Sequence, residues 1–292
     1  MAEFQAIILA GGRGIRLYPL TEETPKSLLP ANDKTLLWYQ LHLLETSGFI
    51  EVLVLTVPDL LPPIQDYVTR EFDGKIHVEL CEVADNTETA DALREVADKI
   101  KCDFIVLAGD LVTDVVLHNV ADFHRINNAS VTMLLRQEAP IRKGEKPRRD
   151  KDMTDCIALA EGQRDEENRV VLVSQAVHMN EDLYVAKSLL KRKKYIASIK
   201  ADLVPHLVRR QFRGADALPE SVREKATSKQ ELAASLSLSE AKHDPEDLVR
   251  CFAYVLPTNA YCERADTIAA YRAMNEEVGS RLRINRSGSI SS

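Results

Sequence analysis

The chain has 292 residues, of which 45% are hydrophobic and 28% are charged, enough to bury the core of one large α/β domain or of two modest ones. Its formal net charge of −7 argues against a general nucleic-acid or membrane-surface binder, because neutralising phosphates takes a surplus of Lys and Arg. The five cysteines include no C-x-x-C pair and are odd in number, which disfavours a disulfide framework. Since the sequence shows neither a secretion signal nor an apolar run of membrane-spanning length, we expect a cytosolic protein.

An apolar run at residues 7–10 stops abruptly at Gly11 and Gly12, which is the pattern of a buried parallel strand that leads into a tight turn. Together with Gly14, these glycines can adopt positive φ and let main-chain N–H groups approach an anion. Three basic residues flank the turn: Arg13, Arg16 and Lys26. Three prolines favour an extended rather than a helical course for the following segment: Pro19, Pro25 and Pro30. The ligand that this pattern predicts is a phosphate chain, and the alternative is a strand end that merely turns the chain.

Two common glycine loops are excluded by residue type. A Walker loop ends in Gly-Lys-Ser/Thr, whereas Gly14 is followed by Ile15, and a dinucleotide-binding fingerprint needs a third Gly where Leu17 stands. The segment instead resembles the sugar-nucleotide pyrophosphorylases, whose motif reads LAGGxGTRLxPLTxxxPKPLLP. The matching positions are 9–12, 14, 16–17, 19–21, 25–26 and 28–30. Ile15 replaces the Thr of that motif, and Ser27 replaces its second Pro.

Beyond the turn, apolar periodicity predicts alternating helices and strands. The expected helices are at residues 36–47, 62–72, 90–100 and 116–126, and the expected strands at 52–57, 76–80, 104–108 and 130–135. Such alternation is typical of the α/β class, and we expect a doubly wound, mostly parallel sheet with helices on both faces. The resemblance specifies this as the nucleotidyltransferase (pyrophosphorylase) type.

Gly109 and Asp110 directly follow the strand expected at 104–108. Because ligands lie at the carboxyl ends of strands in such sheets, this pair and Gly11-Gly12 are expected to face one cleft. In the pyrophosphorylases an Asp at this position holds magnesium, a hard cation that suits a carboxylate. Two interpretations of Asp110 stay open: a weak metal ligand, or a residue that caps the following turn.

The second half of the sequence is less regular. The mixed-charge stretch at 138–152 is either a solvated loop or a docking patch for an acidic partner. We further expect a hairpin (156–159 and 169–173), basic helices (187–195 and 203–212), a flexible insert (about 214–247), a strand (250–256) and a helix (265–278). The expected organisation is one domain at 1–278 followed by a disordered tail at 279–292.

Several residues that the resemblance would assign to catalysis are replaced. The enzymes carry a G-T-A-G-A-L stretch against which the nucleotide base lies, and this chain has ETADAL at residues 88–93, so Glu88 and Asp91 add negative charge there. The F-x-E-K-P and N-x-G-x-Y stretches and the second metal-binding Asp of the family are not found. We therefore expect no catalytic residue, no cofactor and no bound magnesium, and a vestigial phosphate loop that leaves residual nucleotide binding open. Its residues are Gly11, Gly12, Gly14, Arg16 and Lys26.

These departures from the pyrophosphorylase motifs resemble those of one branch of pyrophosphorylase-like proteins, the gamma subunits of eukaryotic translation initiation factor 2B. The segments that carry this resemblance are EFQAIILAGG at 3–12, LLWY at 36–39, TADALR at 89–94, GDLVTDV at 109–115, LVPHLVRRQF at 203–212 and VRC at 249–251. The resemblance implies a non-catalytic scaffold subunit that pairs with the catalytic epsilon subunit in the complex that exchanges GDP for GTP on initiation factor 2. The implied partners are epsilon, the other factor 2B subunits and initiation factor 2, without direct nucleic-acid or membrane contact. The family continues into a left-handed β-helix, which we expect this fold to lack.

Two other functions remain as alternatives. A working mannose-1-phosphate or glucose-1-phosphate nucleotidylyltransferase is favoured by the match over residues 11–30. A nucleotide-sensing module would bind nucleotide without turning it over. The residues at 88–93 and the missing sugar-binding stretches favour the scaffold subunit over both.

Overall fold

The computed structural model describes residues 1, 3–136, 156–160, 168–174, 183–185, 197–211, 249–281, 283–284 and 290–291. Three segments discussed above, at 138–152, 187–195 and 214–247, lie outside the described residues. Within the described part, no helix has the length and apolar character that crossing a bilayer requires.

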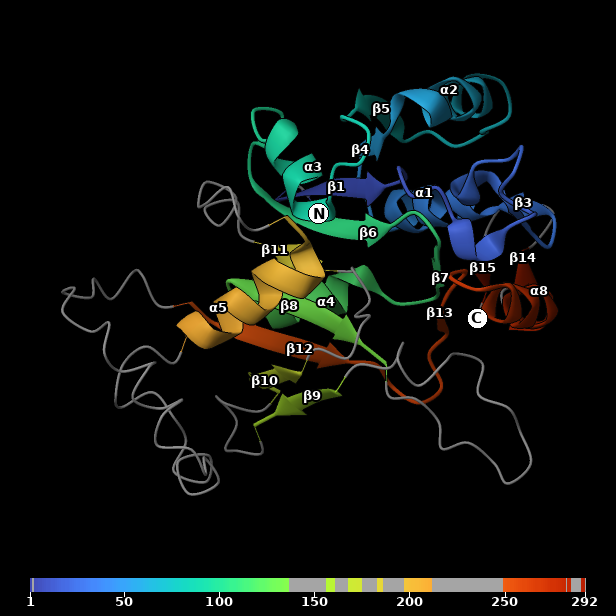
Figure 1. The fold of residues 1–292 in the computed structure, drawn as a ribbon. Helices are drawn as coiled ribbons and strands as arrows, with labels where there is room; N and C mark the ends of the chain where they lie inside the picture. The colour runs from blue at the N-terminus through green and yellow to red at the C-terminus, as the bar shows by residue number, and fades with distance from the viewer. Residues whose placement is uncertain are drawn as a thin grey trace.

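A seven-stranded sheet forms the centre of the fold (Figure 1). In sheet order its strands are β12 (Cys251–Val255), β8 (Val131–Leu135), β11 (Leu183–Val185), β6 (Asp103–Ala108), β1 (Phe4–Leu9), β4 (Glu51–Thr56) and β5 (His77–Glu82). Neighbouring strands run parallel except at β11, which pairs antiparallel with both β6 and β8. The predicted α/β class with a mostly parallel sheet is confirmed, and β11 is the strand that the sequence did not predict.

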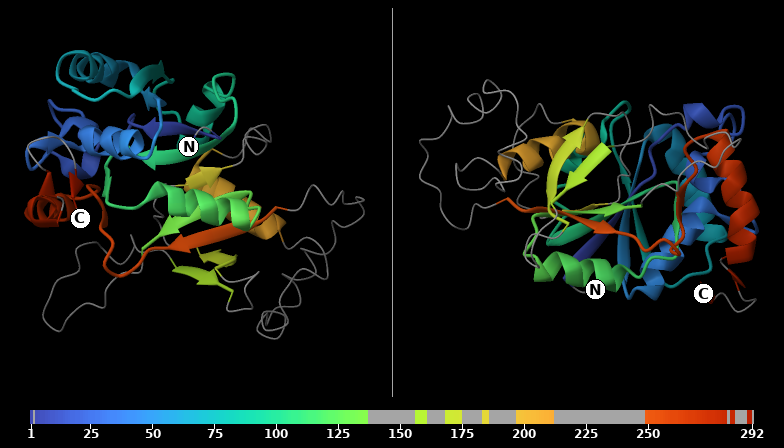
Figure 2. Two further views of the ribbon diagram at one scale, coloured as in Figure 1. Left: turned by 180° about the vertical axis from the view of Figure 1, so that it is seen from behind. Right: turned by 90° about the horizontal axis from the view of Figure 1, so that it is seen from below.

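Helices cover both faces of this sheet (Figure 2). They are α1 (Leu36–Thr46), α2 (Leu61–Arg70), α3 (Thr89–Glu95), α4 (Leu117–Ile126) and α5 (Val204–Arg210). Helix α8 (Ile268–Arg281) lies beside the sheet and packs in a separate cluster with residues of α1. On β1, Ile7 packs in a buried cluster with residues of α3 and α5, whereas Ala6 and Ile8 pack in a second cluster with residues of α1, α2 and α4. The run of apolar residues in β1 therefore reflects a strand that is buried on both faces.

Helix α3 is shorter than its apolar pattern predicts. The expected helix at 90–100 ends at Glu95, and the chain continues in turns that link Ala97 N to Arg94 O and Lys99 N to Val96 O. The side chain of Gln5 on β1 donates to Lys99 O at 3.0 Å and accepts from the N–H of Lys101 at 2.9 Å. Because β1 supplies these hydrogen bonds, the segment leaves the helical path before it enters β6.

Short antiparallel pairs complete the described fold. The predicted hairpin is confirmed as β9 (Cys156–Leu159) with β10 (Val170–Ser174), and β2 (Pro30–Ala31) pairs with β3 (Lys34–Thr35). The sequence did not predict β7 (Leu111–Thr113) and β13 (Cys262–Arg264), which pair with each other and bring the C-terminal segment beside the end of β6. A π-helical turn at Ile199–Leu203 precedes α5.

The structure describes part of the end of the chain. Helix α8 begins at Ile268, three residues after the expected start at 265, and it continues through Val278 to Arg281. Beyond it, β14 (Arg283–Ile284) pairs antiparallel with β15 (Ile290–Ser291). These residues lie within the stretch at 279–292 for which we expected disorder.

Candidate functional site

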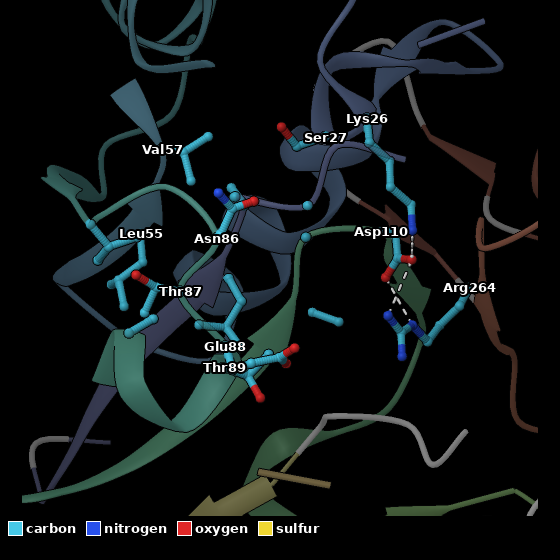
Figure 3. Close-up of a pocket in the computed structure, with 18 residues that line it drawn as sticks. Lys26, Ser27, Leu55, Val57, Asn86, Thr87, Glu88, Thr89, Asp110 and Arg264 are labelled. Atoms are coloured by element: carbon cyan, nitrogen blue, oxygen red, sulfur yellow. Dashed lines mark hydrogen bonds and ion pairs between the residues drawn. The ribbon is translucent and has the colours of Figure 1, made fainter. Parts of the chain in front are cut away.

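A cavity of about 390 Å³ lies at the carboxyl ends of β1, β4 and β6 (Figure 3). Leu9 and Ala108 are opposite one another in the register of β1 and β6, so the two strands end at the same level. Gly11, Gly12, Gly109 and Asp110 all line the cavity. The expectation that the two glycine-containing strand ends face one cleft is therefore met.

Gly109 is the point of closest approach between these two strand ends. Its N–H donates to Leu9 O at 2.8 Å. A Cβ at this position would lie 2.5 Å from Leu9 O, closer than real Cβ atoms come, and 3.0 Å from Ala10 Cα, which is also a tight contact. Glycine is therefore required here, and its small size brings Asp110 against the turn that follows β1.

The glycine turn differs in two respects from its prediction. Gly14 has a φ of 66° and accepts a hydrogen bond from Thr21 Oγ1 at 2.9 Å, whereas Gly11 and Gly12 do not adopt positive φ. The segment that follows is not extended throughout, since Ile15–Leu17 and Lys26–Leu28 form 3-10 turns. Pro25 directly precedes the second of these turns, and its fixed φ is compatible with the start of a helical turn.

The predicted phosphate-binding cations do not gather at the cavity. Arg13 Nη2 instead contacts two carboxylates, Asp85 at 2.8 Å and Asp59 at 3.0 Å. Arg16 is exposed and does not line the cavity, nor does Gly14. Of the five residues predicted to form a phosphate loop, Gly11, Gly12 and Lys26 line the cavity.

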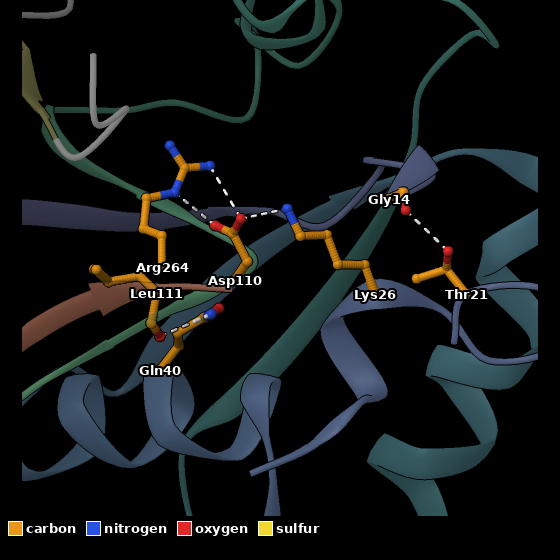
Figure 4. Close-up of polar contacts among 7 residues, drawn as sticks. All are labelled: Gly14, Thr21, Lys26, Gln40, Asp110, Leu111 and Arg264. Atoms are coloured by element: carbon orange, nitrogen blue, oxygen red, sulfur yellow. Dashed lines mark hydrogen bonds and ion pairs between the residues drawn. The ribbon is translucent and has the colours of Figure 1, made fainter. Parts of the chain in front are cut away.

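The side chain of Asp110 is the most deeply buried charge at the cavity, with 2% of its surface exposed. Its carboxylate is paired with Lys26 Nζ and with Arg264, whose Nε lies 2.8 Å from Oδ1 and whose Nη2 lies 3.2 Å from Oδ2 (Figure 4). Burial alone would raise the pKa of Asp110, but the charges of Arg264 and Lys26 outweigh it and hold this pKa well below its usual range. Asp110 is thus an ionised carboxylate that is matched by two cations.

Sequence reasoning did not identify Arg264. The residue belongs to β13, and it reaches Asp110 because β13 pairs with β7 in a register that sets Arg264 opposite Leu111. No local motif around residues 262–264 indicates this pairing. Both earlier interpretations of Asp110 gave it other partners, a metal or the N–H groups of a turn, whereas its carboxylate contacts two basic side chains.

Comparison with known proteins shows two kinds of similarity, to a family model and to individual relatives. Residues 5–143 match the family model described as nucleotidyl transferase. The translation initiation factor eIF2B subunit gamma of Dictyostelium discoideum is 29% identical over 94% of this chain and 75% of its own length, and that of Schizosaccharomyces pombe is 26% identical over 94% and 65%. The chain is thus similar to eIF2B gamma subunits over nearly all of its length.

Other matches are either structural or short. A Bacillus anthracis protein assigned as a glucose-1-phosphate thymidylyltransferase superposes with a TM-score of 0.62 at 15% identity, covering 94% of each chain, which shows a common fold. The eIF2B subunit epsilon of S. pombe is 31% identical over 48% of this chain, and the glucose-1-phosphate thymidylyltransferase of Neisseria gonorrhoeae is 47% identical over 19%. The match to eIF2B gamma thus covers most of the chain, and the match to that transferase covers a short part of it.

In this eIF2B gamma relative the residues around Asp110 do not fit a magnesium ion. Within the described residues, no group of three or more His, Cys, Asp or Glu side chains could hold a metal. Both oxygens of Asp110 contact cationic groups, which would repel a divalent ion, and magnesium is ordinarily bound by more than one carboxylate or by carboxylate and substrate phosphates together.

The two acidic residues that were expected to obstruct a nucleoside have different positions. Glu88 is exposed and lines the cavity, on the side opposite Lys26, Asp110 and Arg264 in Figure 3. Asp91 does not line the cavity; it forms an ion pair with Arg94 one turn along α3. The obstruction predicted from the sequence therefore depends on Glu88, and the expectation for Asp91 is wrong.

Proposed function

We propose that the chain acts as a gamma-type subunit of eIF2B, a non-catalytic scaffold in the exchange factor for initiation factor 2. Its partners are the catalytic epsilon subunit, the other eIF2B subunits and initiation factor 2, and its place of action is the cytosol. The similarity to eIF2B gamma subunits over 94% of the chain supports this assignment. The chain spans 75% and 65% of the length of those two relatives, so their contacts with partners are carried over here as part of the proposal.

The observation that carries the non-catalytic part is the pairing of Asp110 with Lys26 and Arg264. Nucleotidyl transfer needs cations directed at the charge that develops on the phosphates, and in this fold family it also needs a metal held by carboxylates. Here the carboxylate at the metal position is neutralised by side chains of the protein itself. The cavity therefore keeps its shape without the charge arrangement that transfer requires.

A GDP-release assay on initiation factor 2 tests the proposal in three arms: this chain alone, epsilon alone, and both together. We expect no acceleration by the chain alone, because exchange in the family is attributed to epsilon, and we expect the mixture to be at least as active as epsilon with the chain bound to it. Acceleration by the chain alone would contradict the scaffold role.

A second candidate function, sugar-1-phosphate nucleotidylyl transfer, is favoured by the glycine motif and by the fold. It is tested by incubating the purified chain with mannose 1-phosphate or glucose 1-phosphate, each NTP and magnesium, and measuring released pyrophosphate. We expect none above a control without enzyme. Turnover at rates of about one per second or faster, the range of ordinary enzymes, would replace the scaffold proposal by this one.

A further inference from the structure

The position of Arg264 is fixed by the fold rather than by its contact with Asp110 alone. In the β7–β13 pair Arg264 is opposite Leu111, and the next residue, Ala265, donates its N–H to Asp110 O at 3.0 Å. On the other side of β7, the buried side chain of Gln40 donates to Leu111 O at 3.2 Å (Figure 4). The main chain on both sides of the ion pair is thus fixed by hydrogen bonds that involve neither Lys26 nor the carboxylate of Asp110.

The start of β13 is held equally well. Tyr261 N donates to Asp114 Oδ1 at 2.7 Å, and Tyr261 O accepts from Thr113 Oγ1 at 2.7 Å and from Asp114 N at 3.1 Å. The side chains of Arg264 and Lys26 are 15% and 17% exposed, so both cations are largely withdrawn from bulk water. A guanidinium in such a setting is preorganised, because little side-chain entropy is left to lose when it contacts an anion.

The charges on this wall of the cavity do not cancel. Lys26 and Arg264 bring two positive charges and Asp110 one negative charge, which leaves a net charge of about +1 on this wall, whereas the carboxylate of Glu88 lies on the opposite side of the cavity. Polar groups suited to an anion lie close by: the N–H groups of Gly11 and Gly12 have no acceptor among the described residues. Ser27 also lines the cavity, and its buried Oγ has no hydrogen-bond partner within the described chain.

We propose that Arg264 takes the place of a divalent cation at Asp110, so that the cavity binds a phosphate or pyrophosphate group without any metal. Lys26 and Arg264 supply the positive charge, Asp110 positions both of them, and Gly11 and Gly12 donate main-chain hydrogen bonds. Ser27, which stands where the pyrophosphorylase motif has proline, adds a hydroxyl that proline lacks. This inference goes beyond the subunit assignment and holds whichever partner the chain assembles with.

The first test is calorimetric titration of the intact chain with inorganic pyrophosphate, once with EDTA and once with magnesium in excess. We expect the same affinity in both. Replacing Arg264→Gln should weaken binding at least about tenfold, as expected for the loss of a hydrogen bond to a charged group. The control is Arg272→Gln, which removes an exposed Arg of α8 paired with Glu276, and it should leave the affinity unchanged. Parallel titrations with glucose 1-phosphate and with GDP distinguish a sugar phosphate from a nucleotide as the source of the group.

The second test asks whether Arg264 excludes metal. Binding of Mn²⁺, followed by electron paramagnetic resonance, should be absent in the natural chain and should appear in Arg264→Asp, where a second carboxylate would lie beside Asp110. Three results would overturn the proposal: pyrophosphate binding that requires magnesium, an unchanged affinity in Arg264→Gln, or Mn²⁺ binding by the natural chain. If the Arg264 variants fail to fold, the two titrations of the natural chain still decide it. None of these readouts depends on GDP exchange, so they fail or succeed separately from the proposed function.

Discussion

The guanidinium of Arg264 meets the carboxylate of Asp110 across 154 positions of sequence, with Nε 2.8 Å from Oδ1 and Nη2 3.2 Å from Oδ2. Asp110 follows the central strand β6, and Arg264 ends β13 in the C-terminal segment. The pair therefore joins the first half of the chain to the C-terminal segment that contains β13. Lys26 adds a third segment, the turn after β1, to the same carboxylate.

Asp110→Asn should destabilise the fold by about 3–5 kcal/mol, because it leaves two largely buried cations without their counter-ion. Urea unfolding followed by circular dichroism measures this. The matched control is Asp66→Asn on α2, whose carboxylate is half exposed and paired with Arg70, and it should change the free energy of unfolding by less than about 1 kcal/mol. An equal loss of unfolding free energy in the two variants would show that the buried ion pairs of Asp110 stabilise the fold no more than an exposed pair does.

The same pair predicts a dependence on pH. The pKa of Asp110 is lower in the folded chain than the value of about 3.9 in unfolded chains, so its contribution is complete above that value and is lost as pH falls below it. The difference in stability between the natural chain and Asp110→Asn should therefore be constant near neutral pH and should shrink between about pH 4 and pH 2. A difference that grew on acidification would have the opposite sign and would contradict the pairing.

Gly109→Ala should be strongly destabilising, because its Cβ would lie 2.5 Å from Leu9 O between two central strands. A loss of about 3 kcal/mol or more is expected when main chain, and not a flexible side chain, must move. Gly12→Ala is the matched control, since a Cβ there meets no atom within 4 Å and its φ is not positive. The urea unfolding midpoints of the two variants are compared. A loss of stability in Gly109→Ala as small as in Gly12→Ala would mean that the ends of β1 and β6 separate more easily than the structure implies.

His124 should make the chain sensitive to mild acid. Burial lowers the pKa of His124 to about 4, and its Nδ1 lies 2.8 Å from Thr132 Oγ1. An unfolded chain binds the proton first, at a pKa of about 6.5, so the stability that neutral His124 contributes is complete above that pH and falls as pH drops towards 4. The loss over this window is about 3 kcal/mol, at roughly 1.4 kcal/mol per pH unit. In His124→Gln the curve of stability against pH should be flatter, whereas the exposed control His118→Gln should keep the natural slope.

Arg16 and Lys26 should differ in their effect on anion binding, although both were predicted from the sequence to face a phosphate. Arg16→Ala should leave the affinity for pyrophosphate within about twofold, because Arg16 is exposed and outside the cavity, and Lys26→Ala should reduce it about tenfold or more. Titration calorimetry on the two variants measures this. A larger loss from Arg16 would restore the phosphate loop as the sequence predicts it.

The predictable part of the fold is the part encoded locally. The run at residues 7–10, Gly48 at the end of α1 with a φ of 80°, and the strand before Gly109 follow from apolar periodicity and from the special freedom of glycine. The missed strand β11 has three residues, too few for a periodic pattern, and its place in the sheet is set by β6 and β8 on either side. Tertiary context, not local propensity, decides such a strand.

The site was predictable in its location but not in its charges. Gly11, Gly12 and Asp110 could be placed at one cavity because parallel strands present their carboxyl ends at one edge. The partners of the charged side chains could not be predicted, since Arg13 contacts Asp59 and Asp85, and Arg264 contacts Asp110 through a pairing of distant strands. Ion pairs of this kind depend on three-dimensional proximity that no short motif records.

The most direct test of the subunit assignment is association with an epsilon subunit of eIF2B. The two chains would be produced together, captured through a tag on epsilon, and their joint mass measured by light scattering after size-exclusion chromatography. We predict a stable complex that persists at micromolar concentration, which is lost when the tagged partner is an unrelated nucleotidyl transferase of the same fold. A chain that elutes alone at this concentration in the presence of folded epsilon would contradict the account.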